Sequence, residues 1–138
     1  MEILYPMFLV ITLSGALFLL LAAIRVPSII KYFGNLQAAK YSEDLRPKLP
    51  SAARNITDNY NHLFEQPTLF YALVIYIYLM EHADITHIYL AWLYAAFRIV
   101  HSGIQITSNN VSYRALMFIG SGACLMFMIA KEILFFLS

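Results

Sequence analysis

The chain has 138 residues, of which 61% are hydrophobic and 12% are charged, with a formal net charge of +1. A soluble domain averages about 45–50% apolar and about 25% charged residues, and a small domain leaves much of its surface in water. The composition therefore excludes an ordinary soluble domain and predicts that lipid surrounds most of the chain, while the near-neutral charge gives no basis for nucleic-acid binding.

The first half of the chain contains two predicted membrane-spanning helices. Residues 3–24 include no charged residue, so we expect a first helix over roughly 3–30, which lacks the features of a cleaved signal peptide. The next apolar run, 68–80, is too short to cross a bilayer alone. A second helix over roughly 52–81 supplies the missing length, and we expect Pro67 to kink it.

The remaining predicted elements complete a single transmembrane domain over residues 1–138. They are a cytoplasmic loop over roughly 31–51 and two further helices over roughly 85–105 and 112–137. Since one span needs about 20 apolar residues, four spans and their connections use nearly the whole chain. We therefore predict an all-α fold, an integral membrane four-helix bundle.

Basic residues gather on one side of the predicted spans. Eight of the nine lysines and arginines lie between the first two spans or beside the connection between the last two: Arg25, Lys31, Lys40, Arg46, Lys48, Arg54, Arg98 and Arg114. By the positive-inside rule, that side is cytoplasmic. Both termini are then expected on the non-cytoplasmic side.

Two of the predicted helices carry polar side chains that do not suit lipid. Spacings of four, three and four residues relate the members of each set, which are Arg54, Asp58, Asn61 and Glu65 on one helix and Tyr94, Arg98, His101 and Gln105 on the other. This spacing puts each set on one helical face. A charge near the bilayer centre costs about 2.5–3.5 kcal/mol, so we expect the two stripes to be buried against each other or around a polar cavity.

Charge balance within that cavity is the next expectation. Arg98 and Arg114 supply positive charge, and Glu65 and Asp58 are expected to balance it. Arginines near helix ends can instead extend to lipid headgroups, which is the alternative for each arginine taken singly. Glu65 favours the internal site, because a carboxylate is not attracted to lipid phosphate groups and needs a positively charged or hydrogen-bonding partner.

Metal chemistry is not expected. Cys124 is the only cysteine, which excludes an intrachain disulfide and a cysteine-based metal site. His82 and His87 fall in or near the connection between the second and third spans, where interfacial residues are the simpler interpretation.

The combination of residues resembles the MAPEG family, the membrane-associated proteins in eicosanoid and glutathione metabolism. The resemblance is carried by Arg54, Asn61, Glu65, Pro67, Arg98, His101 and Arg114. It implies a four-helix bundle that assembles as a homotrimer, with glutathione as co-substrate bound between neighbouring subunits near the cytoplasmic face. The pocket residues it implies are Arg54, Asn61, Glu65, Arg98 and His101, with Arg114 as the catalytic residue that stabilises the glutathione thiolate.

The function implied by this resemblance is a membrane-embedded glutathione-dependent transferase or peroxidase acting on lipophilic electrophiles. Gln105 stands where many eicosanoid-forming members have tyrosine, and Ala115 stands where the prostaglandin-forming branch has serine. These departures argue against a specific eicosanoid synthase and favour a bacterial-type member in the inner membrane.

Two alternatives stay open from the sequence. A non-enzymatic lipid-binding or scaffold protein of the same fold has no thiol chemistry, so whether the chain is an enzyme is undecided. A small transporter subunit fits less well, because the polar stripes do not extend across the membrane.

Overall fold

The computed structural model describes the backbone of residues 1–138 and every side chain except that of Ser42. Five helices of twelve or more residues form the molecule: α1 (Leu4–Phe33), α3 (Ser51–His62), α4 (Gln66–Leu79), α5 (Ile85–Ile106) and α6 (Val111–Leu137). Shorter segments connect α1 to α3: η1 (Leu36–Lys40), α2 (Ser42–Leu45) and η2 (Arg46–Lys48). The all-α prediction is confirmed, since no strand occurs among the described residues.

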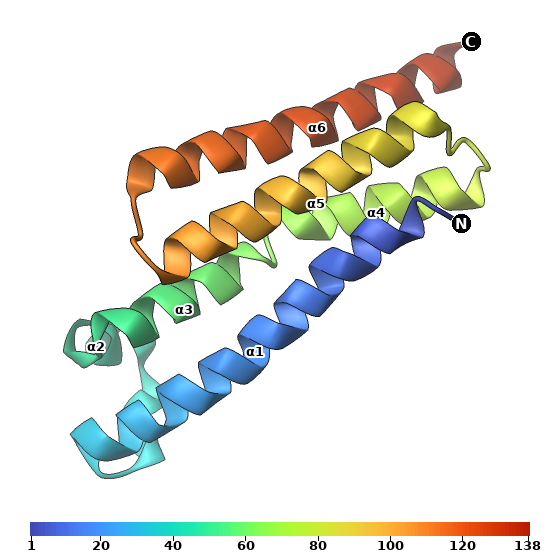
Figure 1. Cartoon of the computed structure of the whole chain (residues 1–138). Coiled ribbons are helices and arrows are strands. Elements are labelled where there is room, and N and C mark those ends of the chain that lie inside the picture. The colour runs from blue at the N-terminus through green and yellow to red at the C-terminus, as the bar shows by residue number, and fades with distance from the viewer.

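The long helices run side by side along one axis. Helices α5 and α6 are antiparallel neighbours, α1 lies beside α5, and α4 contacts both α1 and α6 (Figure 1). Both termini lie at the same end of the molecule as the α4–α5 connection, whereas α2 and the α5–α6 turn lie at the opposite end (Figure 1).

The predicted single helix over 52–81 is interrupted in the structure. Helix α3 ends at His62 and α4 begins at Gln66, with Glu65 at a non-helical φ of −88° and ψ of −97°. Pro67 stands in the first turn of α4. Its missing N–H costs nothing there, because α4 has no carbonyl four residues earlier that could accept a hydrogen bond from it. The proline therefore starts a new helix and does not kink a continuous one, which corrects the expectation.

The connection predicted as a loop over 31–51 is shorter and partly packed. Helix α1 continues to Phe33, and Gly34 ends it with φ 78° and an N–H that donates to the carbonyl of Ile30. Further along, Leu45 and Leu49 are buried against the end of α1 and the start of α3. This apolar anchor holds the connection against the bundle.

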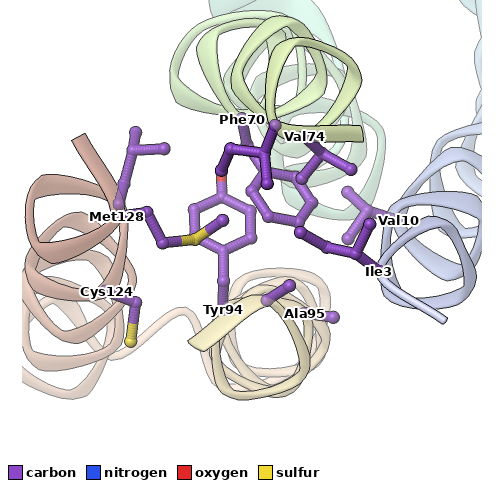
Figure 2. Close-up of a cluster of buried hydrophobic side chains, with 11 residues drawn as sticks. Ile3, Val10, Phe70, Val74, Tyr94, Ala95, Cys124 and Met128 are labelled. Carbon is purple, nitrogen blue, oxygen red and sulfur yellow. The ribbon is translucent and has the colours of Figure 1, made fainter. Parts of the chain in front are cut away.

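The core lies where α1, α4, α5 and α6 meet. Phe70 of α4 stacks on Tyr94 of α5 with ring centroids 4.0 Å apart, and both side chains are fully buried. Val10 of α1 and Met128 of α6 close this layer from either side (Figure 2). Four helices thus meet at this stacked pair of rings. Their packing fixes α5 in the bundle and so sets the position of Arg98, one turn after Tyr94.

Two helices are long and apolar enough to cross a membrane, namely α1 and α6. Most of the surface of α1 is not covered by the rest of the chain, and large side chains such as Phe18 and Leu19 are exposed. Such a long uncovered apolar helix, together with the hydrophobic composition, favours a membrane protein.

A buried polar cluster joins the α4–α5 connection to the end of α6. One oxygen of Glu132 lies 2.7 Å from His82 Nδ1, and the other lies 3.3 Å from Nε2 of the fully buried His87. Lys131 pairs with Asp84, and its hydrogen bond is the main cause that lowers the pKa of Asp84 to about 2. No group of metal-ligating side chains among the described residues is arranged to hold a metal ion.

Glu132→Ala is expected to lower the free energy of unfolding by about 2 kcal/mol, because the buried imidazole of His87 and the half-buried imidazole of His82 lose the carboxylate that faces them. Unfolding followed by circular dichroism in mixed detergent micelles measures the change. Glu132→Gln keeps one acceptor oxygen and should lower the free energy of unfolding by less. Glu2→Gln, at an exposed position, should leave it unchanged. A Glu132→Ala variant as stable as the Glu2 control contradicts this role for the cluster.

Candidate functional site

Arg98 is a cation held inside the bundle. Its side chain is 1% exposed, its Nε donates to the Tyr94 hydroxyl at 3.3 Å, and its guanidinium carbon lies 5.5 Å from the centre of the Phe118 ring. The Nη2 nitrogen is buried and has no hydrogen-bond partner among the described residues. Because a buried charge is costly unless it is paired, this donor suits a negatively charged ligand.

A cavity of about 360 Å³ is lined by Phe118, whose ring also lies against Arg98. We call it the Arg114 cavity, and its walls are formed by His62, Glu65, His101, Val111, Arg114, Ala115, Phe118 and Ile119. Its volume falls within the range of about 300–1,000 Å³ that is typical of small-molecule sites. Polar groups converge on one side and apolar side chains of α6 form the other.

The turn before α6 positions Arg114. Asn110 caps the helix by accepting from the backbone N–H groups of Ser112 and Tyr113. Asn109, in the left-handed region at φ 50°, accepts a hydrogen bond from Arg114 Nη1 and donates to Asn55 of α3 at 3.0 Å. The Arg114 Nε is buried without a partner in the described part of the chain. The guanidinium thus stands in the first turn of α6, where the helix dipole adds positive potential.

Glu65 does not pair with either arginine within one chain. Its Oε2 lies 3.1 Å from Nδ1 of His62, whose ring faces His101 edge-on with centroids 6.2 Å apart. The expectation that Glu65 balances Arg98 and Arg114 is thus replaced by a carboxylate–imidazole pair. His62 is not among the residues that the sequence pattern predicts for the site.

The side of α3 that packs on α5 carries neutral polar residues. Asn59 is fully buried, and its amide exchanges two hydrogen bonds with Ser102, at 3.4 Å and 3.1 Å. Asn55 reaches Asn109 as described, and Gln66 accepts from Ser121 of α6 at 2.7 Å.

The predicted charged stripe is therefore one residue out of register. Asn55, Asn59, His62 and Gln66 share the spacing of four, three and four with the charged set and lie one position further along the chain. Neutral amides can satisfy one another inside a packed interface without the desolvation cost of a charge. That spacing was the available signal for His62.

Arg54 and Asn61 line a separate cavity of about 350 Å³, which we call the Arg54 cavity. Its other lining residues are Arg25, Glu43, Leu45, Arg46, Leu49, Thr57 and Asp58. Asp58, expected to balance the helix-borne arginines, instead pairs with Arg46 at 2.6 Å. Of the six predicted site residues, two thus line the Arg54 cavity and three the Arg114 cavity, while Arg98 lines neither.

Of the two positions that depart from the family pattern, Ala115 lines the Arg114 cavity. Gln105 is buried on α5 with an Oε1 that has no partner among the side chains described.

Comparison with known proteins gave one match. A family model described as the MAPEG family matches residues 3–134, nearly the whole chain. The searches of curated proteins and of solved structures returned no significant match.

Proposed function

The chain belongs to the MAPEG family, and from this premise we propose that it is a membrane-embedded glutathione-dependent transferase or peroxidase acting on lipophilic electrophiles. One observation carries the proposal: Arg114, which lines the Arg114 cavity, and Arg98, which is buried on α5, each hold a buried nitrogen without a partner in the described chain. Glutathione has two carboxylates and an ionisable thiol, and charge-assisted hydrogen bonds to such groups are the strong ones.

The proposed membrane arrangement has four spans, with α3 and α4 together forming the second. The basic residues at the α2 end support a cytoplasmic position for that end, with both termini on the other side. The Arg114 cavity then lies near the cytoplasmic face, where a water-soluble thiol can enter, in a bacterial-type inner membrane.

A homotrimer is the proposed assembly, and the division of the site supports it. Arg54 and Asn61 line one cavity of a chain, whereas Glu65, His101 and Arg114 line the other. A neighbouring copy that sets its Arg54 cavity against the Arg114 cavity brings all of these groups to one ligand. The uncovered apolar surface of α1 leaves room for such a contact.

In the proposed reaction, Arg114 favours the ionised sulfur. A free thiol has a pKa of about 8.5, and each unit by which a neighbouring cation lowers it corresponds to about 1.4 kcal/mol. The thiolate attacks an electrophilic carbon and forms a carbon–sulfur bond, or attacks a peroxide oxygen and cleaves the oxygen–oxygen bond. Val111, Phe118 and Ile119 form the apolar side that admits a substrate from the bilayer.

Glutathione is expected to stabilise the purified protein against heat. Ligand at about one hundred times its Kd adds about 2.7 kcal/mol, which raises Tm by several degrees. The same shift should vanish in Arg114→Ala and, if a neighbouring chain completes the site, in Arg54→Ala. A Tm that does not move at millimolar glutathione overturns the thiol assignment.

A lipid-binding protein without thiol chemistry is the second candidate, favoured by a groove of about 490 Å³ between α1 and the α3–α4 pair. Its lining residues are Ile11, Ser14, Gly15, Phe18, Tyr60, Phe64 and Tyr71. The Ser14 and Tyr71 hydroxyls, 3.4 Å apart, give this aromatic groove one polar point. Bound lipid after purification, together with no glutathione effect on Tm, supports this candidate.

A further inference from the structure

We propose that His62 is the general base that removes the thiol proton in the Arg114 cavity, and that Glu65 is the positioning residue for its ring. This inference rests on the proposed function, because a base is needed there only if a thiol binds. Arg114 stabilises negative charge on sulfur but stays protonated, so the proton needs another acceptor.

The His62–Glu65 pair lies at the break between α3 and α4. His62 is the last residue of α3, Glu65 has a non-helical backbone, and its Oε2 lies 3.1 Å from His62 Nδ1. With Nδ1–H donating to the carboxylate, the ring carries its lone pair on Nε2. No hydrogen-bond partner for Nε2 occurs among the side chains that the structure describes, and the ring lines the cavity.

The charges around this ring suit a proton acceptor. Glu65 stabilises the imidazolium that forms, and Arg114 of α6, which lines the same cavity, stabilises the thiolate. His101 of α5 is the other histidine of the cavity, but no carboxylate in the described chain pairs with its ring. His62 alone combines access to the cavity with a carboxylate partner.

The proposed step moves one proton. The S–H bond breaks, the proton passes to His62 Nε2, and the electron pair stays on sulfur as a thiolate beside Arg114. After the thiolate has attacked the electrophile, the imidazolium gives its proton to the leaving group or to water. The ring then returns to the neutral form held by Glu65.

The test measures thiolate formation directly, by ultraviolet absorbance in a stopped-flow mixing of glutathione with protein in nanodiscs. His62→Gln is expected to slow thiolate formation by about 100-fold, the lower range for loss of a general base. Glutathione affinity should stay unchanged, and added imidazole should restore part of the rate, which a purely structural role does not predict. Glu65→Gln should show a smaller loss of rate, and the exposed Glu2→Gln none.

The outcomes separate this inference from the proposed function. Thiolate formation in the wild type with an unchanged rate in His62→Gln overturns the base and leaves the transferase or peroxidase standing. No thiolate in the wild type overturns the proposed function itself. If the His62→Gln variant does not assemble, the Glu65→Gln variant is used for the test. An unchanged rate of thiolate formation in Glu65→Gln refutes the role of the His62–Glu65 pair.

Discussion

Arg114→Ala is expected to lower kcat/KM for glutathione conjugation by about 100- to 1,000-fold, comparable to the loss of a preorganised group at a developing negative charge. The guanidinium stands at the Arg114 cavity in the first turn of α6, held by Asn109. Without it, the bound thiol ionises at its ordinary pKa of about 8.5, so the rate should keep rising with pH in the neutral range. Turnover of a chromogenic electrophile by the purified protein measures both effects.

Two variants control this experiment. Arg114→Lys keeps the charge but loses the fork of donors that binds Asn109, so an intermediate rate is expected. Lys31→Ala removes a basic residue from the end of α1, away from the Arg114 cavity, and should leave turnover unchanged. If Arg114→Ala turns over like the wild type, thiolate stabilisation by Arg114 is refuted, while the family and the fold stand.

Phe70→Ala is expected to lower the free energy of unfolding by about 3–5 kcal/mol. The ring is fully buried where four helices meet and stacks on Tyr94 at 4.0 Å, so truncation leaves a cavity and removes an aromatic pair. Since Tyr94 accepts the hydrogen bond of Arg98, glutathione binding should weaken as well. Equilibrium unfolding in mixed micelles and the glutathione-induced Tm shift measure the two consequences.

A matched control removes the same ring from the surface. Phe136 is 84% exposed near the end of α6, and Phe136→Ala should change stability by less than about 0.5 kcal/mol. Phe70→Leu, which keeps much of the volume, should lose less than Phe70→Ala. Equal losses at the two phenylalanines contradict a core centred on Phe70 and Tyr94.

Residue types and spacing predicted which face of α5 is buried. The observed helices follow the apolar runs of the sequence, except at the break before Pro67. The stripe of Tyr94, Arg98 and His101 on α5 does face inward, because a long apolar helix can bury its polar residues only on the side away from lipid. Trimer formation, membrane orientation and the roles of the site residues stay predictions.

The sequence could not distinguish the two stripes that run along α3 to the start of α4. Spacings of four, three and four relate both Arg54, Asp58, Asn61 and Glu65 and the neighbouring Asn55, Asn59, His62 and Gln66. Two stripes one residue apart differ by about a quarter turn of the helix, and periodicity contains no information on which one meets α5. Packing decided it, because amides can be paired with Ser102 and Asn109 at less cost than charges can be buried.

The sequence by itself determined that the chain is helical, suited to lipid, and equipped with a few charges that need partners. These properties follow from composition and local periodicity, which do not depend on how helices meet. Only the tertiary structure decided which charges share a cavity and that Glu65 pairs with His62. The reason is geometric: Glu65 lies in the three-residue break between α3 and α4, and the pattern along the chain shows neither that break nor which partner the carboxylate meets.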